Sequence, residues 1–327
     1  MDSSGNAGRF LEIVKPSLVI VVKYDIWYYY LKKIDWLGIP LLLISAIFRK
    51  DMSFFQWYGV LQRKMLSRFD HLFVQSDSSR KLIEKLGLSE TCSISGDTRF
   101  DRVLEIAERA EPIPAIEQFI GKHRAIIAGS TWPVDEEMLK KAFAHINDPS
   151  LRLIIAPHEV SEKHLKELKR LFPDAILYSQ LASIIMHPAF ANAPAGKPAT
   201  SNILLIDNIG MLSRLYKYGY FTYVGGGLTR KGLHNVLEAA VYSKIVFFGP
   251  WYEKHSEAID LVLTGGALPL TDRKKDGQLL ASLIIALQAD KTDYDFRSNA
   301  AGEFVRSNRG ATQKIMSYIQ EKRLLTS

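Results

Sequence analysis

The chain alternates between short apolar runs and longer amphipathic stretches. Residues 18–22 form a continuous β-branched run, LVIVV, typical of a strand buried on both faces of a parallel sheet. Similar runs predict further strands at residues 41–44, 71–75, 92–95, 125–128, 151–156, 175–178, 203–206, 221–224 and 245–248. Helical patterns lie between them, among them residues 6–14, 54–69, 78–86 and 298–323. We therefore predict an α/β fold of doubly wound parallel sheets.

A proline-containing stretch divides this pattern. Residues 110–114 read AEPIP, and the two prolines end the preceding helix. We predict an incomplete first domain over residues 1–113 and a second over 114–327, with the last helix a candidate to pack back on the first. The first domain has four predicted strands, whereas a doubly wound domain usually has five or six. We expect that the natural protein begins earlier, with N-terminal βα units that this chain lacks.

Composition narrows the class of protein. Of the 327 residues, 47% are hydrophobic and 24% are charged, as in soluble globular proteins. A net charge of +7 fits an anionic partner, or merely a surplus of lysines, but no basic run with interleaved aromatics indicates nucleic acid. The single cysteine, Cys92, fits a reducing compartment. No segment has the roughly 18 apolar residues of a membrane helix, so membrane contact is expected to be peripheral.

The strongest chemical signal is the stretch YVGGGLTRKGLHNVLEAA at residues 223–240. A predicted strand ends in glycines, including Gly226 and Gly227, and a basic loop leads to a helix predicted to begin at Asn235. Glycines let a backbone approach a phosphate, and a helix N-terminus suits an anion, while Glu238 can accept from ribose hydroxyls. The alternative is that Asn235 caps the helix and Glu238 complements its dipole. The stretch is neither a Walker A nor a GxGxxG loop.

Two other predicted strands end in candidate ligand contacts. Residues 206–212, IDNIGML, open a helix where a base or ribose can meet the backbone; capping by Asp207 or Asn208 is the structural alternative. Pro157 and His158 follow another strand, where an imidazole suits a phosphate, although a lone histidine is more often structural.

Hydroxyl and charged residues follow three further strands. Ser130 and Thr131 precede a predicted helix and are candidates for binding a carboxylate or phosphate, or for capping that helix. Lys23 and Asp25 follow the predicted strand at residues 18–22. Because they are two residues apart, they would share one face of an extended chain; the alternative is an ion pair within the strand. Arg99 follows the last strand of the first half, at the edge expected to face an interdomain cleft, and can neutralise charge on a leaving phosphate.

In this order, the blocks at residues 16–27, 96–101, 207–212 and 224–240 resemble the lipid A-specific Kdo transferase family. Its members move 3-deoxy-D-manno-octulosonic acid (Kdo) from CMP-Kdo to the lipid A precursor. The resemblance implies a GT-B fold, in which two Rossmann-like domains face a cleft, with the donor bound mainly by the second domain and with no metal or cofactor. It implies transition-state roles for Asp25 and Arg99. The CMP contacts that it implies are Pro157, His158, Ile209, Gly210, Met211, Asn235, Val236, Leu237 and Glu238.

The sequence departs from the family pattern at several of these positions. The family commonly has Glu at Asp25, Lys at Arg99, Arg at His158 and Glu at Met211. The first two changes keep the charge, whereas Met211 leaves only backbone contact and His158 makes a phosphate contact pH-dependent. The family's catalytic base is a Glu in a His-Ser-x-Ser-x-Gly-Glu-like motif, often after a membrane anchor, and this sequence contains neither.

The resemblance implies an inverting glycosyltransferase that moves Kdo from CMP-Kdo to lipid IVA in lipopolysaccharide core biosynthesis. It would work at the cytoplasmic face of a bacterial inner membrane, through peripheral contact and without nucleic acid. The aromatic and basic helix at 54–69, with Arg63, Lys64 and Arg68 off its apolar stripe, is a candidate membrane-facing element; core packing is the alternative. A catalytically impaired CMP-sugar-binding fragment and another GT-B enzyme, such as a nucleotide-sugar epimerase that prefers uridine nucleotides, stay open.

Overall fold

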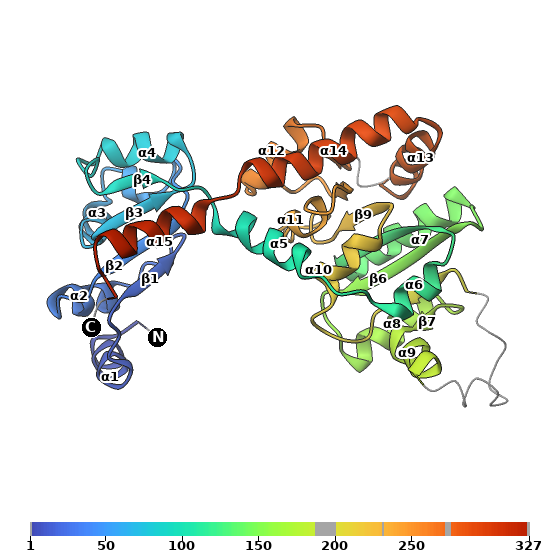
Figure 1. Cartoon of the computed structure of the whole chain (residues 1–327), viewed down its shortest axis with the longest axis horizontal. Coiled ribbons are helices and arrows are strands. Elements are labelled where there is room, and N and C mark those ends of the chain that lie inside the picture. The colour runs from blue at the N-terminus through green and yellow to red at the C-terminus, as the bar shows by residue number, and fades with distance from the viewer. Residues whose placement is uncertain (1, 187–200, 231, 272–275, 326–327) are drawn as a thin grey trace. The chain divides into compact units, whose positions relative to one another are not determined.

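The computed structural model describes residues 2–186, 201–230, 232–271 and 276–325. The chain divides into two compact units, each with its own parallel sheet (Figure 1). The first unit comprises Met1–Arg102 and Asn308–Ser327, and the second comprises Val103–Ser307. The division thus lies ahead of the prolines at which the sequence analysis places a boundary. Among the described residues, no helix is long and apolar enough to cross a bilayer.

The first unit contains a four-stranded parallel sheet whose strand order, β1-β2-β3-β4, follows the chain. Its strands are β1 Val19–Val22, β2 Leu41–Ala46, β3 His71–Val74 and β4 Cys92–Ile94. Its helices are α1 Ser4–Val14, α2 Tyr28–Trp36, the 3-10 helix η1 Ser53–Phe55, α3 Val60–Leu66, α4 Asp77–Glu84, the start of α5 Thr98–Glu108, and α15 Ala311–Glu321. The apolar runs predicted all four strands.

Alternation along β2 fills two cores. Leu41 and Leu43 belong to the larger apolar cluster, whereas Leu42 points to the other face and packs with Ile315 and Ile319 of α15. Figure 1 shows α15 lying along this sheet. The expectation that residues 18–22 are buried on both faces is wrong. β1 is an edge strand, and its Ile20 and Val22 side chains are 43% and 48% exposed.

The second unit has a seven-stranded parallel sheet of order β11-β10-β9-β5-β6-β8-β7. Its strands are β5 Arg124–Thr131, β6 Leu151–Pro157, β7 Ile176–Leu177, β8 Ile203–Leu205, β9 Phe221–Val224, β10 Ile245–Phe248 and β11 Ala267–Pro269. Its helices are α6 Pro114–Ile120, α7 Pro133–Ile146, α8 Glu162–Leu171, α9 Tyr178–Met186, α10 Leu212–Leu215, η3 Tyr216–Tyr218, α11 Leu237–Ala240, α12 Ser256–Leu263, α13 Asp276–Ala289 and α14 Lys291–Ser307. The predicted strands of this half are confirmed, and β11 was not predicted.

Three predicted helices differ from the structure. The helix over 54–69 is interrupted at Gly59, where a β-carbon would lie 1.8 Å from the Ser53 carbonyl oxygen, so only η1 and α3 form. The last helix is broken at Gly310, which has a φ of +108°, and becomes α14 and α15. The helix predicted from Asn235 is only the four-residue α11.

Candidate functional site

The seven-stranded sheet reverses its direction of growth between β5 and β9. From β5 the chain adds strands on one side, as β6, β7 and β8, and then crosses to add β9, β10 and β11 on the other. In open α/β sheets, ligands bind beyond the carboxyl ends of strands at such a switch point. A ligand site in this unit is therefore expected at the segments that follow β5, β6 and β9.

Three rings gather at this switch point, one from each of those segments. The ring centroids of Trp132 and His158 lie 4.6 Å apart, and those of His158 and His234 lie 4.4 Å apart. The Trp132 indole Nε1 donates to His234 Nε2 at 3.1 Å, so neutral His234 carries its proton on Nδ1. His158 is exposed, and its backbone N–H donates to the Thr131 carbonyl. Of these rings, sequence analysis singled out only His158.

Burial and neighbouring imidazoles keep the His234 ring of this stack neutral. Burial lowers the pKa of His234, and the neighbouring imidazoles of His158 and His255 lower it further. At neutral pH the ring therefore offers an apolar face and one N–H donor, which suits stacking against a planar group or donation to an oxygen.

A buried carboxylate fixes the two loops that carry Trp132 and His234. Asp135, in the first turn of α7, is 1% exposed. Its oxygens accept from the Tyr223 hydroxyl at 2.7 Å, the Trp132 amide at 2.9 Å and the Gly226 amide at 3.1 Å. Burial raises the pKa of Asp135, and these hydrogen bonds oppose the rise. Sequence analysis missed this residue, which links α7 to the loop after β9.

The glycines after β9 are needed for contact between backbone segments. A β-carbon on Gly225 would lie 2.2 Å from the Ser130 carbonyl oxygen, and one on Gly227 would lie 2.8 Å from the Gly249 nitrogen. Gly226 and Gly227 are themselves buried. These contacts give the glycines a structural role in packing backbone against backbone. Their role in phosphate binding stays a prediction.

The residues around α11 form a local hydrogen-bonded turn. The Asn235 side chain accepts from the Leu237 amide at 3.3 Å and donates to Glu238 Oε1 at 3.1 Å. Burial raises the pKa of Glu238, and the bond from Asn235 opposes that rise. Val236 and Leu237 are buried, so their side chains face the core. The N-cap of α11 is Val236, so the alternative that Asn235 caps the helix is wrong as stated, although its side-chain oxygen accepts from the Leu237 amide within the turn. Ligand roles for Asn235 and Glu238 stay predictions.

The segment after β8 presents backbone and one large exposed side chain. Gly210 has a φ of +93°, Ile209 is 87% exposed, and Met211 is buried at the start of α10. The capping alternative for Asp207 is wrong as stated, because Asp207 accepts from the Ser179 amide at 3.0 Å, near the start of α9, rather than capping α10.

The hydroxyl residues at the end of β5 are largely occupied by the protein itself. Thr131 is buried, and its hydroxyl donates to Glu136 Oε1 at 2.9 Å. The same carboxylate oxygen lies 2.9 Å from His164 Nε2. Burial raises the pKa of Glu136, and His164 opposes that rise. Ser130 adopts a left-handed φ of +52°, which places it at a bulge between β5 and β6.

In the first unit, the two predicted catalytic residues follow strands at opposite edges of the sheet. Asp25 follows β1 and is exposed, and Arg99 lies at the start of α5 beyond β4. Three strand spacings of about 4.8 Å separate these edges, on the order of 14 Å. Lys23 has a left-handed φ of +63°, so the chain is not extended there and the expectation that Lys23 and Asp25 share a face is wrong.

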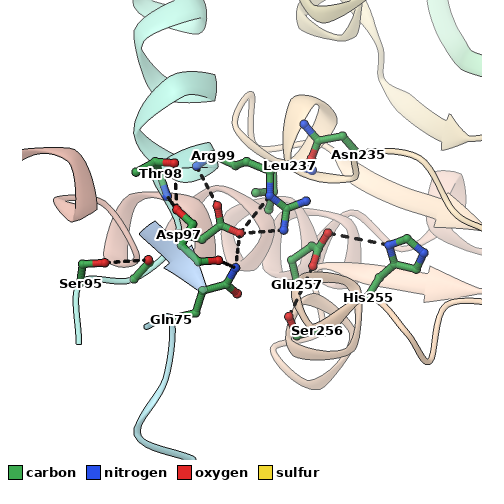
Figure 2. Close-up of polar contacts among 12 residues, drawn as sticks. Gln75, Ser95, Asp97, Thr98, Arg99, Asn235, Leu237, His255, Ser256 and Glu257 are labelled. Atoms are coloured by element: carbon green, nitrogen blue, oxygen red, sulfur yellow. Dashed lines mark hydrogen bonds and ion pairs between the residues drawn. The ribbon is translucent and has the colours of Figure 1, made fainter. Parts of the chain in front are cut away.

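Arg99 belongs to a polar network that sequence analysis missed (Figure 2). Its guanidinium donates to Asp97 Oδ2 at 2.7 and 2.9 Å, and Gln75 donates to the same oxygen at 3.0 Å. Gln75 also donates to the Ser45 carbonyl, and the Ser45 hydroxyl accepts from the Thr98 amide. Polar groups after β2, β3 and β4 thus meet at neighbouring strand ends.

Comparison with known proteins finds similarity to one group of transferases. Residues 1–102 match the family model described as 3-deoxy-D-manno-octulosonic-acid transferase (kdotransferase). The 3-deoxy-D-manno-octulosonic acid transferase of Rickettsia felis is 23% identical over 95% of this chain. The chain is therefore similar to Kdo transferases, and its first 102 residues match their family model. A bifunctional glycosyltransferase/methyltransferase of Fusobacterium nucleatum subsp. nucleatum is also 23% identical, over 99% of this chain.

The chain spans 46% of the length of the Fusobacterium protein and 64% of the length of the Rickettsia protein. Its fold is shared with a solved putative UDP-N-acetylglucosamine 2-epimerase from Listeria monocytogenes. The two align with a TM-score of 0.65 and 14% sequence identity, over 99% of this chain and 79% of the other. With two parallel α/β sheets in separate units, the chain has the GT-B fold.

Proposed function

We propose that this chain is the nucleotide-sugar-binding body of an inverting glycosyltransferase that moves Kdo from CMP-Kdo to lipid IVA. The observation that carries the proposal is the stack of Trp132, His158 and His234 at the switch point of the second unit's sheet. The similarity to Kdo transferases supports the choice of donor. The product would be an intermediate of the lipopolysaccharide core.

The donor contacts that we propose surround this stack. The CMP phosphate is assigned to Pro157 and His158, where an exposed imidazole follows a strand end. The base and ribose are assigned to two short segments of the chain. These segments comprise Ile209, Gly210 and Met211, and Asn235, Val236, Leu237 and Glu238. Gly226, Gly227, Ser130 and Thr131 are assigned to the part of the site nearest the phosphate. The two glycines are buried, the Thr131 hydroxyl donates to Glu136, and Ser130 is partly exposed.

In the proposed reaction, an acceptor hydroxyl attacks the anomeric carbon of Kdo, and the bond to the CMP phosphate breaks with inversion. Asp25 and Arg99 are proposed to stabilise the charges that develop in the transition state. The Arg99 guanidinium is held by Asp97, so its position is set before any ligand binds. This preorganisation supports an electrostatic role for Arg99.

Nucleotide preference tests the proposal. We expect CMP at about a hundredfold excess over its Kd to stabilise the chain by about 2.7 kcal/mol, and UDP to stabilise it much less. The change His158→Ala should shrink the CMP-induced shift in melting temperature, whereas Glu159→Ala, at the adjacent exposed residue, should not. A larger shift with UDP than with CMP would instead favour an epimerase-like enzyme. CMP binding without sugar transfer would favour a non-catalytic binding module.

We also propose that the first unit contacts the cytoplasmic face of a bacterial inner membrane. Support comes from an aromatic tip, defined as Trp57, Tyr58, Val60 and Leu61, at the start of α3. Trp57 is 88% exposed, and the other three are at least half exposed. Exposed Trp and Tyr side chains beside aliphatic ones favour the interface between water and lipid.

A basic hollow lies next to this aromatic tip. It has a volume of about 540 Å³, and its lining comprises Lys50, Arg63, Lys85, Phe55, Leu82 and Leu86. Positive charge over an apolar floor suits phosphorylated lipid, the chemistry of the proposed acceptor. Arg63 itself donates to the carbonyls of Phe54 and Gln56, and Arg68 pairs with Asp35. Two of the three basic residues that the sequence suggested for membrane contact therefore have structural partners.

A further inference from the structure

A smaller hollow lies between the loops that follow β9 and β10 in the second unit. Its lining comprises Arg230, Gly232, Trp251, Glu253, Lys254 and His255, and its volume is about 260 Å³. Pockets that bury drug-sized ligands measure roughly 300–1,000 Å³. This hollow is therefore large enough for one sugar or one anionic group, and too small for a whole nucleotide.

Backbone contacts hold the two walls of this hollow together. The Trp251 amide donates to the Gly227 carbonyl at 2.9 Å. A β-carbon on Gly227 would lie 2.8 Å from the Gly249 nitrogen, which shows how closely the two loops approach. On the other side, a β-carbon on Gly232 would lie 3.5 Å from His255 Nε2. The hollow thus joins the glycine-rich loop to the loop after β10.

The groups around the hollow favour an anion with planar geometry. The Arg230 guanidinium carbon lies 4.8 Å from the centroid of a Trp251 ring. The Arg230 side chain is exposed, and a guanidinium offers two parallel N–H groups that suit a bidentate contact with a carboxylate. Lys254 adds a second cation, and Glu253 is the acidic side chain of the lining. Arg230 and Lys254 together outweigh Glu253.

Two further features of the lining bear on which ligand atoms fit the hollow. The Trp251 indole Nε1 is buried and has no hydrogen-bond partner among the described residues. A buried N–H without an acceptor is costly, so a ligand oxygen there would satisfy it. His255 Nδ1, in another lining residue, lies 3.9 Å from a carboxylate oxygen of Glu257. Figure 2 shows the two side chains facing each other.

We propose that this hollow is an anion subsite that takes the carboxylate of an acidic sugar. The assignment rests on the proposed function, because an acidic sugar attached to CMP supplies the carboxylate. A phosphate oxygen of the nucleotide has similar hydrogen-bonding chemistry, and the experiment below distinguishes the two sources. Arg230 binds the anion in a bidentate manner, Trp251 donates through its indole N–H, and Lys254 contributes charge.

Two substitutions separate these contributions. Arg230→Gln removes the charge and the guanidinium fork. Trp251→Phe keeps one six-membered ring for stacking and removes the N–H together with the pyrrole part of the indole. Arg170→Gln is the matched control, because it makes the same charge change at an exposed position on α8 of the same unit. Calorimetry with CMP, freshly prepared CMP-Kdo and free Kdo at one ionic strength measures each affinity.

We expect the affinity for CMP to stay within about twofold in all variants, while that for CMP-Kdo falls about ten- to a hundredfold in Arg230→Gln. Trp251→Phe should cost about five- to tenfold, and Arg170→Gln about nothing. An equal loss for CMP and CMP-Kdo would place the nucleotide phosphate in the hollow and overturn the carboxylate assignment. Unchanged CMP-Kdo affinity would overturn it as well.

Failure of the proposed function gives a different result. If the unmodified chain binds no CMP, the proposed function fails, and free Kdo alone then decides the subsite. Binding of free Kdo that is weakened by Arg230→Gln supports the carboxylate subsite. Absence of Kdo binding, or binding that Arg230→Gln leaves unchanged, overturns it.

Discussion

The two sheets differ in strand order, and this difference decides which strand ends meet. In the first unit the order follows the chain, so Asp25 and Arg99 follow strands at opposite edges. In the second unit the chain starts in the middle of the sheet and grows in both directions, so the ends of β5 and β9 are neighbours. Polar and aromatic residues after strands become a site where the strand order brings those ends together.

The largest loss of stability is expected from removing Asp135, the buried carboxylate that links the loops after β5 and β9. Asp135→Ala leaves the Tyr223 hydroxyl and the amides of Trp132 and Gly226 without their acceptor. Each of the three buried donors that loses this acceptor costs about 1–3 kcal/mol, so we expect the second unit to lose about 3–9 kcal/mol of unfolding free energy. Urea denaturation followed by tryptophan fluorescence measures the loss.

Two controls sharpen this comparison of the units. Tyr223→Phe removes one of the three bonds and should cost about 1 kcal/mol. Asp97→Ala in the first unit should cost less than Asp135→Ala, because Arg99 is partly exposed and its guanidinium can reach water. If Asp97→Ala proved the more destabilising change, the buried link in the second unit would not be what holds its loops together.

A smaller, pH-dependent effect is expected at His234, whose pKa is lowered by burial and by His158 and His255. Below about pH 6.5 the unfolded chain takes up a proton that the folded chain resists, so the unfolded state gains stability. The second unit should therefore lose stability as pH falls below the pKa of the unfolded histidine. His234→Gln keeps an acceptor for Trp132 without titrating, so its melting temperature should depend less on pH. Parallel pH profiles for the two proteins would contradict this prediction.

The smallest effect on stability is expected at the aromatic tip of the first unit. The double change Trp57→Ser and Leu61→Ser alters exposed side chains, so the unfolding free energy should stay within about 0.5 kcal/mol. Co-sedimentation with anionic vesicles should nevertheless fall several-fold. The change Leu263→Ser, at an exposed leucine of the second unit, should leave co-sedimentation unchanged. Equal losses from both variants would mean that non-specific adsorption of exposed apolar side chains, rather than the aromatic tip, binds the protein to vesicles.

Local patterns predicted the strands well because each apolar run records burial of its own residues. β11 was missed because its three residues carry too little pattern. At the break in the predicted helix, Gly59 lies against the Ser53 carbonyl. Helical periodicity does not show this contact, because it records only which positions along the helix are apolar. His158 could be named from its place after a strand. Trp132 and His234 could not be joined to it, because they are 102 residues apart and meet only through the strand order.

The close approach of Gly227 and Gly249 has a consequence for how sequences of this kind can diverge. A β-carbon on Gly227 would meet the Gly249 backbone, and one on Gly249 would lie 2.3 Å from the Gly227 backbone. The clash is reciprocal and involves backbone on both sides, so a change at one position has no compensating change at the other. The two positions should therefore stay glycine together instead of covarying, which makes the pair a marker for finding the same hollow in distant homologues.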